Sequence, residues 1–352
     1  MNSEHLNRVF QNTTNSYKYY WWLSILEIFS QQEQKEISFD EIVFKTISKL
    51  WYPVNYFKLS FGTADQCATY IKEIKQHYLL EDDLNEHDLY EFLTENKDSD
   101  LLSKITAELT RYVPYRFIRP WFSQETRGVK DSRVNSKILE VQDETAPYQI
   151  DAGSKKIIIN ESWVKWLKRY RTLAKAHTLF SLVRYLEKRN PNVSSLSKKL
   201  EKPETRNLTS ATKYWRSFVS TNPNEVDVFG KKPLGALDNF SLDHYMPWSF
   251  FTHDLIWNLH PVEKQINSSK NNLIPDRSYL KPFAGLQYSF CNFLLKKEEN
   301  KALESYYSFF KCSKDGLNQL SKYEFLRKME RFYLPQYEIA ENMGFDSNWR
   351  LS

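Results

Sequence analysis

The chain has 352 residues, of which 41% are hydrophobic and 26% charged, with a formal net charge of +5; this balance is typical of globular proteins and excludes a largely disordered chain. Glycine accounts for only 8 residues, well below the ordinary ~7%, which argues against glycine-rich phosphate loops. The three cysteines are too few and too far apart for a disulfide framework or a four-cysteine zinc site. The longest apolar run, 19–29, is shorter than the roughly 20 residues of a membrane helix, so we expect a soluble cytoplasmic protein with no membrane partner.

The N-terminal region predicts helices. Apolar residues recur at helical spacing in three stretches: 20–29, 42–50 and 70–78. Ser38 and Glu41 have the spacing of a capping box at the start of the second helix, and Pro53 is expected to end that helix.

An acidic stretch follows at 81–108, where ten carboxylates stand against Lys97 and Lys104. This composition is typical of short solvated helices that avoid phosphate, and it leaves open a docking or self-inhibiting surface. The next segment, Tyr112–Phe122, is aromatic and contains two prolines, so we expect a packed connector here and no regular helix.

The middle and the C-terminal parts of the chain combine a small hairpin with further helices. Two short strands are predicted at Lys137–Val141 and Lys155–Ile159. Helices are predicted at about 163–189, 209–219, 298–310 and 317–332.

The segment 242–275, LDHYMPWSFFTHDLIWNLHPVEKQINSSKNNLIP, carries the most specific pattern. Asp243 and His244 are adjacent, Asn258 lies 14 residues after His244, Asn267 follows nine residues later, and Lys270 three residues after that. Together these side chains offer a carboxylate, a base that is neutral near physiological pH, an amide oxygen and a cation.

These residue types suit phosphodiester hydrolysis with one Mg²⁺ (or Mn²⁺). Magnesium prefers oxygen ligands and keeps several waters, so a carboxylate, an amide oxygen and the substrate phosphate complete its site. A neutral histidine, with an ordinary pKa near ~6.5, can take a proton from the attacking water. A lysine one helical turn after Asn267 could offset phosphate charge.

The segment resembles the HNH (ββα-metal) endonuclease superfamily, and its Asp-His, Asn and Asn-x-x-Lys spacing is similar to that of the HNH module of type II CRISPR effectors. The resemblance implies that Asp243 and Asn267 are metal ligands and that His244 is the general base. It further implies that Asn258 holds the loop and orients His244, and that Lys270 stabilises the helix or the phosphate. No flanking cysteine pairs are present, so the module must be supported by packing from the rest of the protein.

A basic stretch precedes this segment. Residues 165–216 hold fourteen Lys or Arg and three Glu, with aromatic side chains interleaved, a composition suited to phosphate contact and stacking. The candidate nucleic-acid-binding residues lie on the predicted helix 163–189: Lys165, Lys168, Arg169, Arg171 and Lys175. Some must be simply solvated, because their spacing spreads them around the helix. No helix-turn-helix or zinc-finger pattern is present, so the sequence gives no basis for base-specific reading.

These observations predict a mainly α protein with a small embedded α+β (ββα-metal) nuclease module. The expected segments are a helical domain at 1–122, a hairpin and basic helical region at 123–229, the HNH module at 230–285 and C-terminal helices at 286–352. The expected function is metal-dependent cleavage or nicking of DNA, and analogy with related proteins adds bacterial defence against foreign DNA. A catalytically silent or partner-dependent nucleic-acid-binding protein and an RNase stay open, as do a homodimer and a partner subunit.

Overall fold

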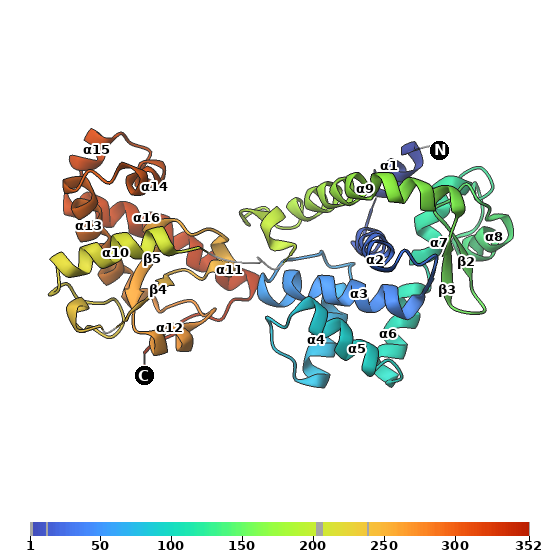
Figure 1. Ribbon diagram of the computed structural model, residues 1–352, viewed down its shortest axis with the longest axis horizontal. Coiled ribbons are helices and arrows are strands. Elements are labelled where there is room, and N and C mark those ends of the chain that lie inside the picture. Colours follow the sequence, from blue (N-terminus) through green and yellow to red (C-terminus); the bar gives the residue numbers. More distant parts are fainter. Residues whose placement is uncertain (1–2, 12, 202–206, 238, 352) are drawn as a thin grey trace. The chain divides into compact units, whose positions relative to one another are not determined.

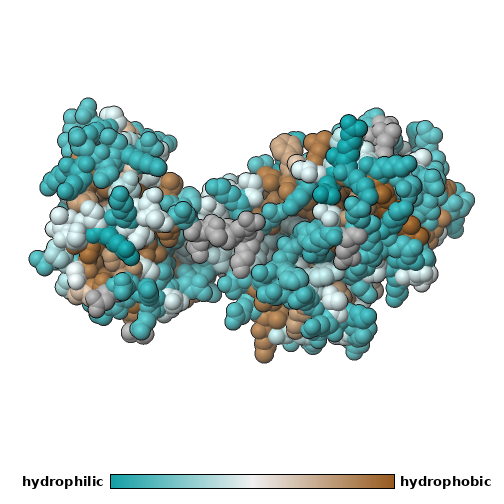
Figure 2. Space-filling model, in the orientation of Figure 1, coloured by the Kyte–Doolittle hydropathy of each residue, from teal (hydrophilic) through white to brown (hydrophobic). Residues whose placement is uncertain are grey.

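The computed structural model describes residues 3–11, 13–201, 207–237 and 239–351 (Figure 1). It groups the chain into two compact units, Met1–Lys202 and Pro203–Ser352, where the sequence suggested four segments. The first unit includes residues from both sides of the expected boundary at 122/123. Residues 36–38 pair with 156–159 in one sheet, and the long basic helix, 161–187, packs on the helix at 17–32. Hydrophilic side chains predominate on the face shown in Figure 2.

The first unit is mainly helical. Its helices are α1 (Ser3–Gln11), α2 (Tyr17–Gln32), α3 (Phe39–Trp51), α4 (Cys67–Tyr78), α5 (Glu86–Glu95), α6 (Asp100–Thr110), α7 (Val113–Ile118), α8 (Val134–Val141) and α9 (Glu161–Glu187), with a π-turn at Tyr52–Tyr56 and 3₁₀ turns at Arg119–Phe122, Asp131–Arg133 and Leu196–Lys199. The predicted early helices, the two helices of the acidic stretch and the long basic helix are therefore present.

Helix α2 is the centre of this unit because it is apolar on nearly all sides, which favours a fully buried helix. It packs against α3, α7 and α9, and Figure 1 shows it between α3 and α9. The predicted capping box forms at the start of α3: the Ser38 hydroxyl accepts from the Glu41 backbone N–H, and the Glu41 carboxylate accepts from that of Ser38.

A three-stranded antiparallel sheet, in the order β1-β3-β2, completes the unit: β1 is Glu36–Ser38, β2 is Tyr148–Asp151 and β3 is Lys156–Ile159. The strand predicted at Lys155–Ile159 is present as β3. The prediction of a strand at Lys137–Val141 was wrong, since those residues belong to α8. Val134 and Ile138 are both buried there. Residues four positions apart lie on the same face of a helix and of a strand, so their spacing does not distinguish the two.

The expected connector Tyr112–Phe122 also differs, because it contains the short helix α7 followed by a 3₁₀ turn. Both prolines lie in the first turns of these elements, where a missing backbone N–H breaks no intrahelical hydrogen bond.

The second unit builds one hydrophobic core around a two-stranded antiparallel sheet. Its elements are α10 (Thr209–Thr221), β4 (Ser241–His244), α11 (Trp248–Phe251), β5 (Leu259–Val262), α12 (Lys264–Lys270), α13 (Leu280–Lys296), α14 (Asn300–Phe310), α15 (Lys314–Asn318) and α16 (Lys322–Met343), with 3₁₀ turns at Leu234–Ala236, Ile256–Asn258 and Arg277–Tyr279.

Aromatic stacking joins the small sheet to the surrounding helices. The rings of Tyr245 and Phe283 are 4.0 Å apart between centroids, and those of Trp215 and Phe290 are 3.7 Å apart. The Tyr245 hydroxyl is 2.7 Å from that of Tyr337 on α16. The ββα module thus takes its core from α10, α13 and α16, which agrees with the expectation that neighbouring packing must support it. No helix in the described part of the chain is long and apolar enough to cross a membrane.

Candidate active site

The candidate site lies on β4, β5 and α12, which follow one another closely in sequence. The two strands are antiparallel, and Asp243 pairs with His260 across the sheet. Asp243 and His244 end β4, and α12 follows β5 after one residue. This order of two strands and a helix is the ββα arrangement that the resemblance implied.

Asn258 clamps the chain just after His244. Its side-chain NH₂ donates to the Met246 carbonyl oxygen at 2.9 Å, and its Oδ1 accepts from the Met246 N–H at 3.1 Å and the Tyr333 hydroxyl at 3.1 Å. The Asn258 carbonyl oxygen also accepts from the Tyr245 N–H at 2.8 Å. A buried amide with this many partners resists rearrangement, so Asn258 fixes the backbone that carries His244.

The His244 ring is held by a residue that the motif did not include. Its Nε2 lies 2.8 Å from Asp254 Oδ1. Because an ionised carboxylate only accepts hydrogen bonds, this contact places a proton on Nε2 and leaves Nδ1 of the neutral ring as a proton acceptor. The pair has the form of a base oriented by a carboxylate.

Asp243 is buried beside two basic side chains. Its carboxylate is 4% exposed; Lys270 Nζ lies 3.1 Å from Oδ1 and 3.0 Å from Oδ2, and His260 Nε2 lies 3.4 Å from Oδ2. Burial alone would raise the pKa of Asp243, but the charge of Lys270 and the contact with His260 outweigh it and hold that pKa below its ordinary value. Asp243 is therefore a carboxylate that stays ionised inside the module.

Lys270 faces the interior of the module. It is 0% exposed, and its ammonium also donates to the His244 carbonyl oxygen at 2.8 Å. Of the two roles that the resemblance implied, stabilising α12 and contacting phosphate, these contacts correspond to the first. The lysine joins α12 to the end of β4.

Asn267 lies on α12 facing the first residue of β4. Its side-chain NH₂ donates to Ser241 Oγ at 3.0 Å, and no hydrogen bond to its Oδ1 is found among the described residues. Ser241 and Asp243 are two residues apart on one strand and therefore lie on the same face of the sheet.

The donors fit a hard divalent cation only in part. Asp243 offers a buried carboxylate and Asn267 an amide oxygen, and both donor types suit magnesium, but both carboxylate oxygens already lie within 3.1 Å of Lys270 Nζ. No group of three or more His, Cys, Asp or Glu side chains that could hold a metal is present in that part of the chain. A cation bound here would therefore be coordinated by one oxygen of Asp243 and the amide oxygen of Asn267, and water and the substrate phosphate would supply its other ligands.

The family model of the HNH endonuclease matches residues 230–276, which contain all of these side chains. This segment of the chain is a member of the HNH superfamily. The resemblance noted from the sequence is thereby confirmed, and the HNH module indicates a nuclease whose substrate is a nucleic acid. Neither the curated proteins nor the solved structures include a match to the chain.

Two residues beside the HNH motif have closer contacts with it than the sequence suggested. His260 packs on the rings of Phe229 and Phe283, and its Nε2 also lies 3.4 Å from Asp243 Oδ2. Asp254 lies in the loop between the strands, where no periodic pattern marks it. An acidic residue ten positions after His244, inside so short a module, was the available signal.

The basic residues predicted to bind nucleic acid lie on α9, in the first unit. Lys168 pairs with Glu33 at 2.6 Å and Lys175 with Glu201 at 3.1 Å, so intramolecular carboxylates offset both charges. Lys165, Arg169 and Arg171 are exposed, and no ion pair of theirs is found in the described part of the chain. Of the five candidate residues, three therefore carry a charge that no ion pair found among the described residues offsets.

Proposed function

We propose that the protein is a metal-dependent endonuclease that cleaves phosphodiester bonds of DNA. What supports this most is the geometry around His244: a base that is fixed at Nε2 by Asp254, follows Asp243 directly, and is carried on a strand end clamped by Asn258. The HNH family match supports the nuclease class, and the proposal adds the DNA substrate and the roles of the residues.

The proposed roles follow from the chemistry of each side chain. His244 takes the proton of the attacking water at Nδ1 as the new P–O bond forms. The scissile P–O bond breaks, its leaving oxygen takes a proton from solvent, and Asp254 stabilises the imidazolium of His244. Asp243 and Asn267 would hold Mg²⁺ or Mn²⁺, which would offset negative charge on the phosphate. Lys270 keeps the charge of Asp243 compensated inside the fold.

Nucleic acid would also contact the first unit. We assign phosphate contacts to Lys165, Arg169 and Arg171, which are exposed and carry charges that the first unit does not use in ion pairs found among the described residues. Such contacts position a strand without reading its bases. One HNH site cuts one strand per engagement, so a double-strand cut requires a second copy or a second nick. The proposed role in defence against foreign DNA rests on analogy with other HNH proteins.

Supercoiled plasmid tests the proposal. Purified protein incubated with plasmid and Mg²⁺ or Mn²⁺ should produce nicked circles, and EDTA should abolish that conversion. A labelled single-stranded RNA in a parallel reaction should stay intact. Plasmid left supercoiled but retarded in a gel shift would instead support the silent or partner-dependent binding protein, and cleavage of the RNA alone would support an RNase.

A further inference from the structure

A second site is formed in the first unit, far in sequence from the nuclease motif. A groove of about 800 Å³ lies between α1, the residues that follow it, and the last three turns of α9. Ligand pockets commonly have volumes of ~300–1,000 Å³, so this groove has room for a small molecule.

The groove is strongly cationic. Arg184, Lys188 and Arg189 line it, and none of the described residues along its walls is acidic. The nearby carboxylate of Asp65 is buried and already accepts hydrogen bonds from the backbone N–H groups of Ser16 and Cys67. Three permanent positive charges without a facing carboxylate favour an anion with more than one negative charge.

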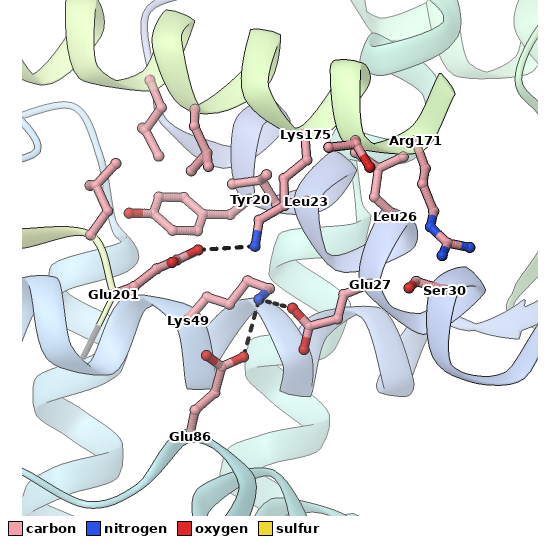
Figure 3. Close-up of a pocket in the computed structure, with 14 residues that line it drawn as sticks. Tyr20, Leu23, Leu26, Glu27, Ser30, Lys49, Glu86, Arg171, Lys175 and Glu201 are labelled. Atoms are coloured by element: carbon pink, nitrogen blue, oxygen red, sulfur yellow. Dashed lines mark hydrogen bonds and ion pairs between the residues drawn. The ribbon is translucent and has the colours of Figure 1, made fainter. Parts of the chain in front are cut away.

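Another pocket of the same unit shows the contrast (Figure 3). There Lys49 reaches the carboxylates of both Glu27 and Glu86, and Lys175 pairs with Glu201. Three glutamates, Glu27, Glu86 and Glu201, line that pocket together with Lys49, Lys175 and Arg171, so its formal charges balance and give no reason for it to select an anion. The groove between α1 and α9 is different because its positive charges have no such partners along its walls.

Arg189 is held in place for binding. Its guanidinium carbon lies 3.6 Å from the centre of the Tyr185 ring, and it donates to the carbonyl oxygens of Tyr185 at 3.0 Å and Thr14 at 3.1 Å. Gly62, at φ +92°, admits it closely, since a Cβ there would lie 2.8 Å from Arg189 Nε. Two of the five N–H groups of the guanidinium form these hydrogen bonds. Because the side chain is already held in one conformation, its remaining N–H groups can bind a ligand with little further loss of side-chain entropy.

Aromatic and amide groups lie beside the cations. Phe180 is 62% exposed, one helical turn before Arg184, whose guanidinium is 5.9 Å from the ring centre. His177 Nδ1 is buried without a hydrogen-bond partner among the described residues, and the side chains of Asn7 and Gln11 line the opposite wall. An exposed flat ring next to cations is the arrangement in which a nucleobase stacks while its phosphates are bound.

We propose that this groove binds a free nucleotide, with the phosphates at Arg184, Lys188 and Arg189 and the base on Phe180. Cations are favoured at the C-terminal end of any helix, but that effect accounts neither for an exposed aromatic ring nor for a guanidinium fixed against a glycine. The site goes beyond the proposed nuclease and does not depend on it.

Calorimetric titration of the full chain with ATP, GTP, CTP and UTP, at 150 mM salt, tests the assignment. At least one of the four should bind with a dissociation constant in the micromolar range, and the R184E/K188E variant should weaken that binding at least about tenfold. Phe180→Ala should weaken the nucleotide more than inorganic tripolyphosphate, since only the nucleotide loses stacking. All three side chains are exposed, so these variants should fold.

The matched control is K72E/K104E, which makes the same charge change at exposed positions of α4 and α6 and should bind like the wild type. Failure of all four nucleotides to bind would overturn the proposal, as would equal binding by R184E/K188E. Binding of a 5′-phosphorylated hexanucleotide but of no free nucleotide would also overturn it, in favour of a nucleic-acid end. Plasmid cleavage is read separately, so the nuclease can fail while this site stands.

Discussion

Replacing Lys270 with methionine should locally unfold the nuclease module. The lysine is fully buried and contacts both oxygens of Asp243 at 3.0–3.1 Å and the His244 carbonyl at 2.8 Å. Methionine keeps the length of the side chain but leaves a buried carboxylate without its compensating charge, and breaking a buried pair in this way costs about 3–5 kcal/mol. At 1.4 kcal/mol per factor of ten, the opening constant of β4 and β5 should rise by about two to three and a half powers of ten.

Hydrogen exchange followed by mass spectrometry measures this change without assuming that the two units unfold together. Peptides that cover β4 and β5 should lose protection in Lys270→Met, and peptides from the first unit should not change. Lys264→Met is the control, because Lys264 is an exposed lysine on the same helix. The double variant D243N/K270M should recover most of the protection, since no buried charge remains. Unchanged exchange in Lys270→Met would refute the buried ion pair.

Three further outcomes are expected. Asp254→Asn should slow plasmid cleavage at least about tenfold and shift its pH profile, with DNA binding unchanged, because His244 loses its orienting carboxylate; a wild-type profile would contradict this. Burial lowers the pKa of Lys199 to about 7, against an unfolded value near ~10.4, so the unfolded state binds more protons between these two values. The free energy of unfolding should therefore rise with pH across that window, by up to about 5 kcal/mol. Lys199→Met should flatten this rise in equilibrium unfolding, and an unaltered slope would disprove it. Charge reversal at Lys165 and Arg169 should weaken DNA binding and lower its salt slope by about two, and a wild-type slope would exclude phosphate contacts there.

The ββα module could be predicted because its motif residues are local in sequence. The residues Asp243, His244, Asn258 and Asn267 lie within 25 positions, and the resemblance to the HNH superfamily places them at a strand end, in a loop and on a helix. The family match covers the same segment. Their contacts mostly join neighbours along the chain, so few tertiary interactions had to be guessed.

Features of the site that depend on tertiary packing could not be predicted from the sequence. Lys270 was correctly placed one turn after Asn267, but its burial depends on how α12 packs on β4, and spacing along a helix does not determine that. Asp254 lies outside any regular element, so no period marked it. The ion pairs of Lys168 and Lys175 join residues 135 and 26 positions apart, beyond the reach of a charge count.

The same reasoning applies to the fold. The strand Glu36–Ser38 has three residues and pairs with β3 about 120 positions away, so its sequence carries no usable alternation, although the capping box that begins at Ser38 was predicted. The apolar residues of 134–141 fit a strand and a helix equally, and packing decided for the helix. The hydrophobic core that α10, α13 and α16 share with the module likewise arises only in three dimensions.

The central claim is that His244 performs the proton transfer in DNA cleavage. The most direct measurement compares plasmid cleavage by the wild type, His244→Ala and His87→Ala in Mg²⁺, with DNA binding measured for each in the same buffer. His87 is an exposed histidine of α5 in the first unit and serves as the matched substitution. The account predicts that His244→Ala binds DNA like the wild type but no longer nicks it, while His87→Ala does both. Cleavage by His244→Ala at the wild-type rate would contradict the assignment.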